Sequence, residues 1–132
     1  MSSVITCKWL RKAGNNLRSA ELLLENGLTG ESTFHSQQAA EKALKALITA
    51  LGEQPPKTHN ITRLLQVIEE RGVDTSKLGG RGVERLTVYA VEARYPDFEE
   101  EPTEEEAREA LGLARAVVEW VIEKLGELGV EC

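Results

Sequence analysis

The chain has 132 residues, of which 41% are hydrophobic and 29% are charged, a balance typical of one globular domain. Its 22 acidic and 16 basic residues give a net charge of −6, which disfavours a general nucleic-acid scaffold but leaves room for a local basic pocket. No apolar run is long enough for a signal peptide or a membrane span. We therefore expect a single cytoplasmic domain over residues 1–132, with no membrane contact.

Two long helices are predicted in the first part of the chain. Apolar residues recur at spacings of three and four over residues 6–26 and again over residues 34–51, as one buried face of a helix requires. Residues 28–31 form the predicted link between them, and Ser32 or Thr33 is the predicted N-cap of the second helix.

The second predicted helix carries a polar stripe nearly opposite its apolar face. His35, Gln38, Lys42 and Lys45 follow one another at helical spacing, and Glu41 stands four residues before Lys45. Such a stripe is suited to binding phosphate or the acidic surface of a partner. The spacing alone fits an ordinary solvated helix face better.

A stiff connector follows, because Gly52 and the pair Pro55-Pro56 end the second helix. It presents Lys57 and His59 just before the third predicted helix, where free backbone N–H groups favour anions. A lone histidine beside a helix cap is also commonly a structural hydrogen bonder, and the sequence favours that simpler interpretation.

Two more helices complete the prediction. The fourth spans about 82–94, after an irregular stretch over residues 73–82, and the last begins with the capping box of Thr103 and Glu106 and extends to about Leu128. Together these elements predict an all-α protein, an antiparallel up-and-down four-helix bundle with an additional short helix.

The end of the fourth predicted helix places a cation, an aromatic ring and a carboxylate close together, in Arg94, Tyr95 and Asp97. An arginine there also simply complements the helix dipole. Cys7 and Cys132 show no metal-ligand spacing, so we expect no metal and no cofactor. A bridge between these two cysteines stays open, but two reduced thiols are the expectation.

The segments FHSQQAAEKALKALI, PPKTHNITRLL and ARYPD, followed by a long Glu-rich helix, resemble the HEPN domain family over nearly the whole chain. The resemblance implies a helical bundle that forms a homodimer, a partner minimal nucleotidyltransferase and a toxin–antitoxin setting. HEPN ribonucleases carry an Arg followed by a His after four to six residues on a late helix. This chain has only His35 and His59, and neither follows an Arg at that interval.

We therefore expect a non-catalytic HEPN protein that binds a nucleotide, a partner minimal nucleotidyltransferase or both, with RNA a less favoured ligand. Its lysines would meet phosphates or acidic groups, its histidines would hydrogen-bond, and Tyr95 would stack or close the pocket. Two alternatives stay open, a metal-independent ribonuclease built from His59 and Arg94, and a purely structural dimerisation module. The candidate binding residues are His35, Gln38, Glu41, Lys42, Lys45, Lys57, His59, Arg94, Tyr95 and Asp97.

Overall fold

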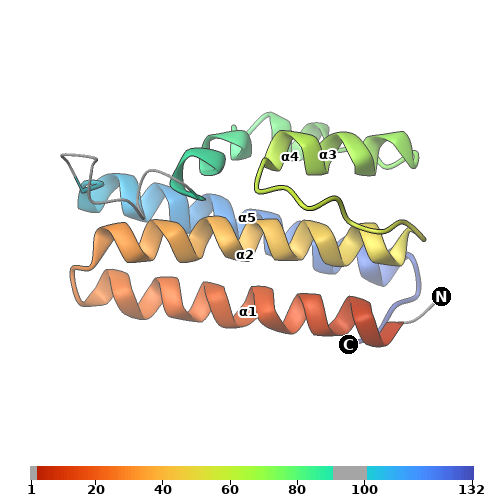
Figure 1. The fold of residues 1–132 in the computed structure, drawn as a ribbon, viewed down its shortest axis with the longest axis horizontal. Coiled ribbons are helices and arrows are strands. Elements are labelled where there is room, and N and C mark those ends of the chain that lie inside the picture. Colours follow the sequence, from red (N-terminus) through yellow and green to blue (C-terminus); the bar gives the residue numbers. More distant parts are fainter. Residues whose placement is uncertain (1–2, 91–100) are drawn as a thin grey trace.

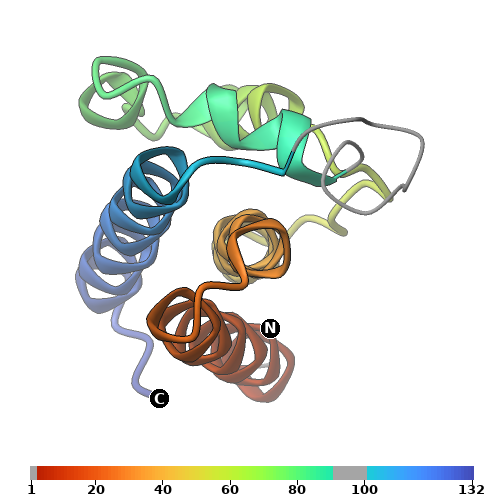
Figure 2. The same cartoon turned by 90° about the vertical axis from the view of Figure 1, so that its left-hand side faces the viewer.

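The computed structural model describes residues 3–90 and 101–132, and every regular element in this part of the chain is helical. Three long helices lie side by side, and the shorter elements form a further layer against two of them (Figure 1, Figure 2). The predicted all-α bundle is confirmed. In chain order the elements are α1 (Ser3–Glu25), α2 (Thr29–Ala50), α3 (Ile61–Glu70), α4 (Ser76–Gly79), the 3₁₀ helix η1 (Val83–Ala90) and α5 (Glu104–Glu127).

Helix α2 is the centre of the bundle. It packs against α1, α5, α3 and η1 (Figure 2), so that residues on nearly all of its sides are buried. The small and branched residues predicted for its apolar face indeed lie in the core. These are Ala40, Ala43, Leu44, Leu47 and Ile48, all without solvent exposure.

The start of α2 differs from the prediction. The helix begins at Thr29, so the predicted link over residues 28–31 is mostly helical and the predicted N-caps lie inside the helix. The buried Ser32 hydroxyl donates to the carbonyl of Ala20 in α1 at 2.8 Å, and Thr33 donates to the carbonyl of Gly30 at 2.9 Å. Packing against α1 therefore overrides the local capping preference.

The stretch between α3 and α5 also departs from the prediction. The irregular stretch contains the one-turn helix α4, and the predicted fourth helix is the 3₁₀ helix η1 as far as Ala90. Residues 91–94 of that prediction lie outside the described residues. The elements on either side begin with side-chain caps: Asn60 caps α3 by accepting from Arg63 N, and the predicted capping box of Thr103 and Glu106 opens α5.

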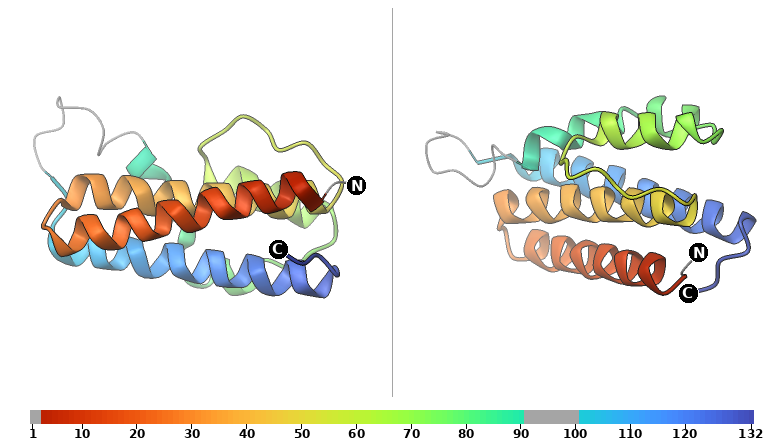
Figure 3. Two further views of the ribbon diagram at one scale, coloured as in Figure 1. Left: turned by 90° about the horizontal axis from the view of Figure 1, so that it is seen from below. Right: turned by 45° about the vertical axis from the view of Figure 1, so that its right-hand side comes forward.

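The connector, residues 51–60, runs back beside α2 instead of leading away from it (Figure 3). Near the end of α2, Glu53 accepts from the Arg71 guanidinium at 3.0 Å. At the other end of the connector, His59 lies against Glu41, in the middle of α2. The connector therefore covers one side of the C-terminal half of α2.

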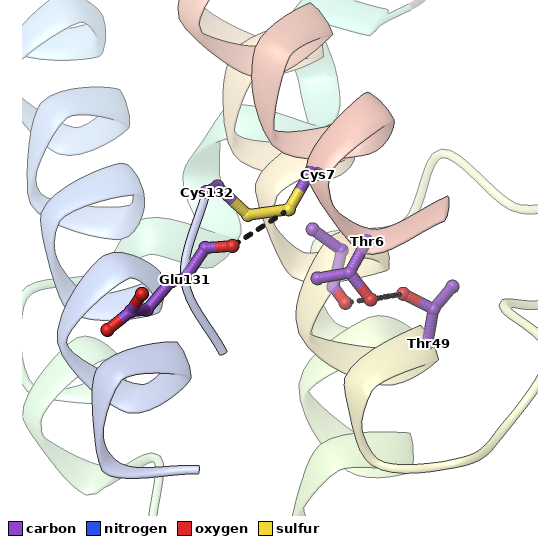
Figure 4. Close-up of a disulfide and its surroundings, with 6 residues drawn as sticks. Thr6, Cys7, Thr49, Glu131 and Cys132 are labelled. Carbon is purple, nitrogen blue, oxygen red and sulfur yellow. Dashed lines mark hydrogen bonds between the residues drawn. A yellow bond between two sulfur atoms is a disulfide. The ribbon is translucent and has the colours of Figure 1, made fainter. Parts of the chain in front are cut away.

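The two ends of the chain are joined, which corrects the expectation of two reduced thiols. Cys7 and Cys132 form a disulfide across a sequence separation of 125 residues, and Cys7 Sγ also lies 3.6 Å from the carbonyl oxygen of Glu131 (Figure 4). Sequence spacing gave no sign of the bond, because it depends on the end of α5 lying beside the start of α1.

No helix among residues 3–90 and 101–132 has the combination of length and apolar character that crossing a membrane requires.

Candidate functional site

A buried carboxylate stands at the centre of the polar face of α2. Glu41 is 4% exposed, and its Oε1 accepts from His59 Nδ1 at 2.8 Å, from Gln37 Nε2 at 3.1 Å and from Gln38 Nε2 at 3.4 Å. Its Oε2 accepts from the ammonium of Lys45 at 2.9 Å. One side chain thus joins α2 to the last residues of the connector. We call Glu41, Lys45, His59, Gln37 and Gln38 the Glu41 cluster.

The Glu41 cluster keeps its carboxylate ionised. Burial acts to raise the pKa of Glu41, but hydrogen bonds from Lys45, His59 and Gln37 and the charge of Lys45 together outweigh it and lower that pKa. A carboxylate in this state only accepts hydrogen bonds, so His59 Nδ1 is the donor. The His59 side chain is 63% exposed, which leaves the rest of its ring at the surface.

A second cluster forms around Asn16 of α1, one helix away. Lys42 Nζ donates to Asn16 Oδ1 at 2.9 Å, and Asn16 Nδ2 lies 2.9 Å from His35 Nδ1. Since the amide oxygen is taken by Lys42, the amide N–H₂ faces the histidine, and Nδ1 of His35 must accept. We call Asn16, His35 and Lys42 the Asn16 cluster.

This arrangement requires a neutral His35, with its proton on Nε2. The pKa of His35 is lowered, first by burial and then by the positive charge of Lys42, in agreement with that protonation state. Burial lowers the pKa of Lys42 as well, and the nearby Lys12 adds to this effect. The Asn16 cluster therefore presents one ammonium and one neutral imidazole between α1 and α2.

An open cleft of about 770 Å³ lies beside the Glu41 cluster. Helix α1 contributes Ile5 and Trp9 to its lining, α2 contributes Lys45 and Thr49, and the connector contributes residues 52–57. The Lys45 ammonium lies 5.7 Å from the centre of the Trp9 ring, a cation–π distance. The cleft therefore has a charged group held against an aromatic wall.

The polar stripe of α2 is not a solvated helix face, which corrects the simpler interpretation of the sequence. Glu41 and Lys45 are 4% and 8% exposed, and His35, Gln38 and Lys42 are only partly exposed. Helix α1 covers one side of the stripe and the connector covers another. The sequence pattern could not reveal this, because periodicity does not say what packs on a polar face.

The structure brings seven of the candidate residues to one side of α2. Six of them belong to the two clusters, and Lys57 lies beside them in the lining of the cleft. The other three, Arg94, Tyr95 and Asp97, lie outside the described residues.

Sequence reasoning missed three residues that shape this region, Asn16, Gln37 and Trp9. A weak signal existed for two of them. Asn16 is a poor helix former in the middle of a strongly periodic helix, which suggests a specific role for its amide. Gln37 stands four residues before Glu41, the spacing at which side chains meet on a helix. Within the described part of the chain, no group of three or more His, Cys, Asp or Glu side chains is placed to hold a metal ion.

The chain is similar to known proteins in both sequence and fold. The family model of the HEPN domain matches residues 6–125. The chain belongs to the HEPN family. The crystal structure of TT1696 from Thermus thermophilus is similar to this HEPN protein, with 36% sequence identity and a TM-score of 0.80 over 91% of this chain and 98% of that one.

A second solved structure, that of the archaeal HEPN homologue ST0689, is 26% identical, with a TM-score of 0.72 over 91% of this chain and 97% of that one. No curated protein matches the chain. The HEPN resemblance read from the sequence is thus confirmed, while the association with a minimal nucleotidyltransferase stays a prediction.

Proposed function

We propose that this HEPN protein is a non-catalytic binding protein whose ligand is a nucleotide. The observation that carries the proposal is an open cleft lined by Lys45 and Lys57, with Lys42 nearby on the same polar stripe of α2. Ammonium groups are strong partners for phosphate oxygens, and the cleft volume lies in the range of small-molecule sites.

The ribonuclease alternative finds less support. The Arg and His spacing of HEPN ribonucleases is absent from the sequence. His59 is the more exposed histidine, and its Nδ1 is engaged by Glu41, whereas the neutral His35 is held between α1 and α2. If the protein cleaves RNA without metal and His59→Ala abolishes the cleavage, the ribonuclease alternative is right. If RNA stays intact at high protein concentration, the non-catalytic proposal is supported.

The proposal is tested by isothermal titration of the protein with ATP and AMP. We expect binding to the wild type, weakened about tenfold by Lys42→Glu, since that change reverses a charge on the polar stripe about one helical turn from Lys45 of the cleft lining. Lys77→Glu is the matched control, because it makes the same charge change at an exposed residue of α4 that does not line the cleft. Absence of binding at millimolar nucleotide would overturn the proposal, provided that circular dichroism shows a folded protein.

We also propose the two partners that the HEPN resemblance implies, a second copy of the chain and a minimal nucleotidyltransferase. A homodimer and a complex with a minimal nucleotidyltransferase, in a toxin–antitoxin setting, are tested by co-purification with neighbouring gene products and light scattering. A homodimer that elutes alone would favour the nucleotide or the structural role. A stable complex with a nucleotidyltransferase would identify the partner directly.

A further inference from the structure

The cleft beside the Glu41 cluster is lined by both charged and apolar side chains. Its cation from α2, Lys45, is paired with Glu41 at 2.9 Å and lies against the Trp9 ring. An ammonium has three N–H donors, and Glu41 uses one of them, so donors remain for a ligand in the cleft. Because Glu41 and Lys45 are themselves buried and paired, Lys45 is held in place before any ligand arrives.

The net charge of the cleft is set by Lys57. The charge of Lys45 is balanced by Glu41, and the Glu53 carboxylate is paired with the Arg71 guanidinium at 3.0 Å. Lys57 is exposed and makes no ion pair within residues 3–90 and 101–132. The cleft therefore has one uncompensated positive charge, which complements an anion.

The apolar side of the cleft is exposed to solvent. Ile5 is 46% exposed in the first turns of α1, and it lies with Trp9 in the lining that also includes Pro55 and Pro56 of the connector. A flat ring gains from contact with such surfaces, through removal of apolar area from water and through stacking on the indole.

The wall formed by the connector is fixed at both ends. At one end, the Arg71 guanidinium donates to the carbonyl of Leu51 at 2.6 Å and to Glu53. At the other end, the carbonyl of His59 accepts from Gln37 at 3.0 Å. Two prolines stiffen the segment between these ends. The cleft is thus formed in the free protein, which lowers the entropic cost of binding a small ligand.

We infer that this cleft is the binding site of a nucleoside phosphate, with the base against Trp9 and Ile5 and the phosphates between Lys45 and Lys57. This inference rests on the proposed function and assigns it a location. It also gives Glu41 a role, as a positioning residue that holds Lys45 toward the phosphates.

The test separates the two halves of the ligand by titration with ATP and with adenosine. Lys57→Gln removes the uncompensated charge, so we expect it to weaken ATP binding about tenfold while adenosine binding stays unchanged. Trp9→Leu should weaken both ligands, whereas Trp9→Phe should retain most of the binding because it keeps an aromatic ring. Lys77→Gln is the control for removal of a remote positive charge.

A spectroscopic readout locates the ligand independently of affinity. The chain has two tryptophans, and Trp120 is buried at 3% exposure. We expect the indole N–H signal of Trp9, assigned with Trp9→Phe, to shift with ATP while that of Trp120 stays in place. If wild type binds ATP but the cleft variants bind it equally well and the Trp9 signal does not move, the cleft is not the site and the proposed function stands. If the wild type binds no nucleotide, both the proposed function and the assignment of the cleft as its site are wrong.

Discussion

The hydrogen bond from Asn16 to His35 fits only a neutral imidazole. The Asn16 amide oxygen is committed to Lys42, so its N–H₂ group must point to Nδ1 of the imidazole. If the His35 imidazole were protonated, its Nδ1–H would face the N–H₂ group of Asn16, so that two donors would meet with no acceptor between them. Burial and the charge of Lys42 lower the pKa of His35, which also favours the neutral imidazole. The amide of Asn16 on α1 therefore acts together with burial and Lys42 to favour a neutral His35 on α2.

This relation predicts the effect of Asn16→Asp. In the wild type the folded state holds His35 neutral, so the free energy of unfolding falls as pH drops below the ordinary histidine value of 6.5. The new carboxylate would accept from a protonated imidazole and raise the pKa of His35 above its ordinary value of 6.5. The variant should instead gain stability at low pH and lose it as pH rises through the raised pKa.

The measurement is an NMR titration of the His35 ring, with denaturant unfolding at several pH values. His35→Gln is the control, since it should remove the pH dependence that this residue causes. An unchanged pKa of His35 in Asn16→Asp would contradict the hydrogen-bond assignment.

Glu41 and Lys45 form the second prediction at this scale. Glu41→Gln leaves the ammonium of Lys45 buried without its counter-charge, so we expect a loss of about 3 kcal/mol in the free energy of unfolding. Since the pKa of Glu41 is lowered in the folded state, the stability that it contributes is present above its ordinary value of 4.5 and is lost as pH falls below it. The variant should be less sensitive to acid.

Urea unfolding at pH 7 and pH 4 measures both effects. The double variant Glu41→Gln with Lys45→Met removes the unpaired charge and should recover part of the stability. A double variant as unstable as the sum of the two single variants would show that the pair does not couple.

At the scale of elements, the helix ends explain where glycine is needed. Gly129 follows α5 with a φ of +78°, and the N–H of Val130 reaches back to the carbonyl of Leu125 at 2.9 Å, which closes the helix. Gly112 lies inside α5 at an exposed position with ordinary helical geometry. Neither glycine has an atom within 4 Å of the place where a Cβ would stand.

These two glycines form a matched pair for a prediction. Gly112→Ala should stabilise the protein by about 1 kcal/mol, because alanine is the better helix former. Gly129→Ala should destabilise it by about 1 kcal/mol, because an L side chain is strained at positive φ even in open space. Denaturant midpoints measure both changes. Effects of the same sign would contradict the backbone assignment of one of the two positions.

At the scale of the whole molecule, the disulfide makes the chain nearly a closed ring. It ties the start of α1 to the residues that follow α5, which are the two ends of the sequence. A bond that closes so long a loop restricts the unfolded chain strongly, by about 5 kcal/mol in the chain-entropy account. Next to it, the hydroxyl of the buried Thr6 lies 2.7 Å from that of the partly buried Thr49, and this contact joins α1 to α2 (Figure 4).

We therefore predict a large effect of reduction on stability. Adding a reductant to the wild type should lower the free energy of unfolding by up to about 5 kcal/mol, while the double variant Cys7→Ser with Cys132→Ser should show no response to it. Urea unfolding with and without reductant measures this difference. Labelling of both native cysteines by a maleimide without reductant would show that the bond is absent.

Much of the fold follows from the sequence by itself. The three- and four-residue spacing of apolar residues predicts the long helices, and the capping box at Thr103 fixes the start of α5. These signals are short-range, since a cap or a helical face depends on neighbours within a few residues. The same is true of the segments that carry the HEPN resemblance, which the family match confirms.

Only the tertiary structure decided what covers each face. Burial of Glu41 and Lys45, the early start of α2 and the 3₁₀ form of η1 all depend on packing between elements. The cleft likewise needs α1, α2 and a connector that turns back on itself. The bond between Cys7 and Cys132 needs both ends of the chain at one place. Residue spacing contains no information on such contacts, because they join parts of the chain that are far apart in sequence.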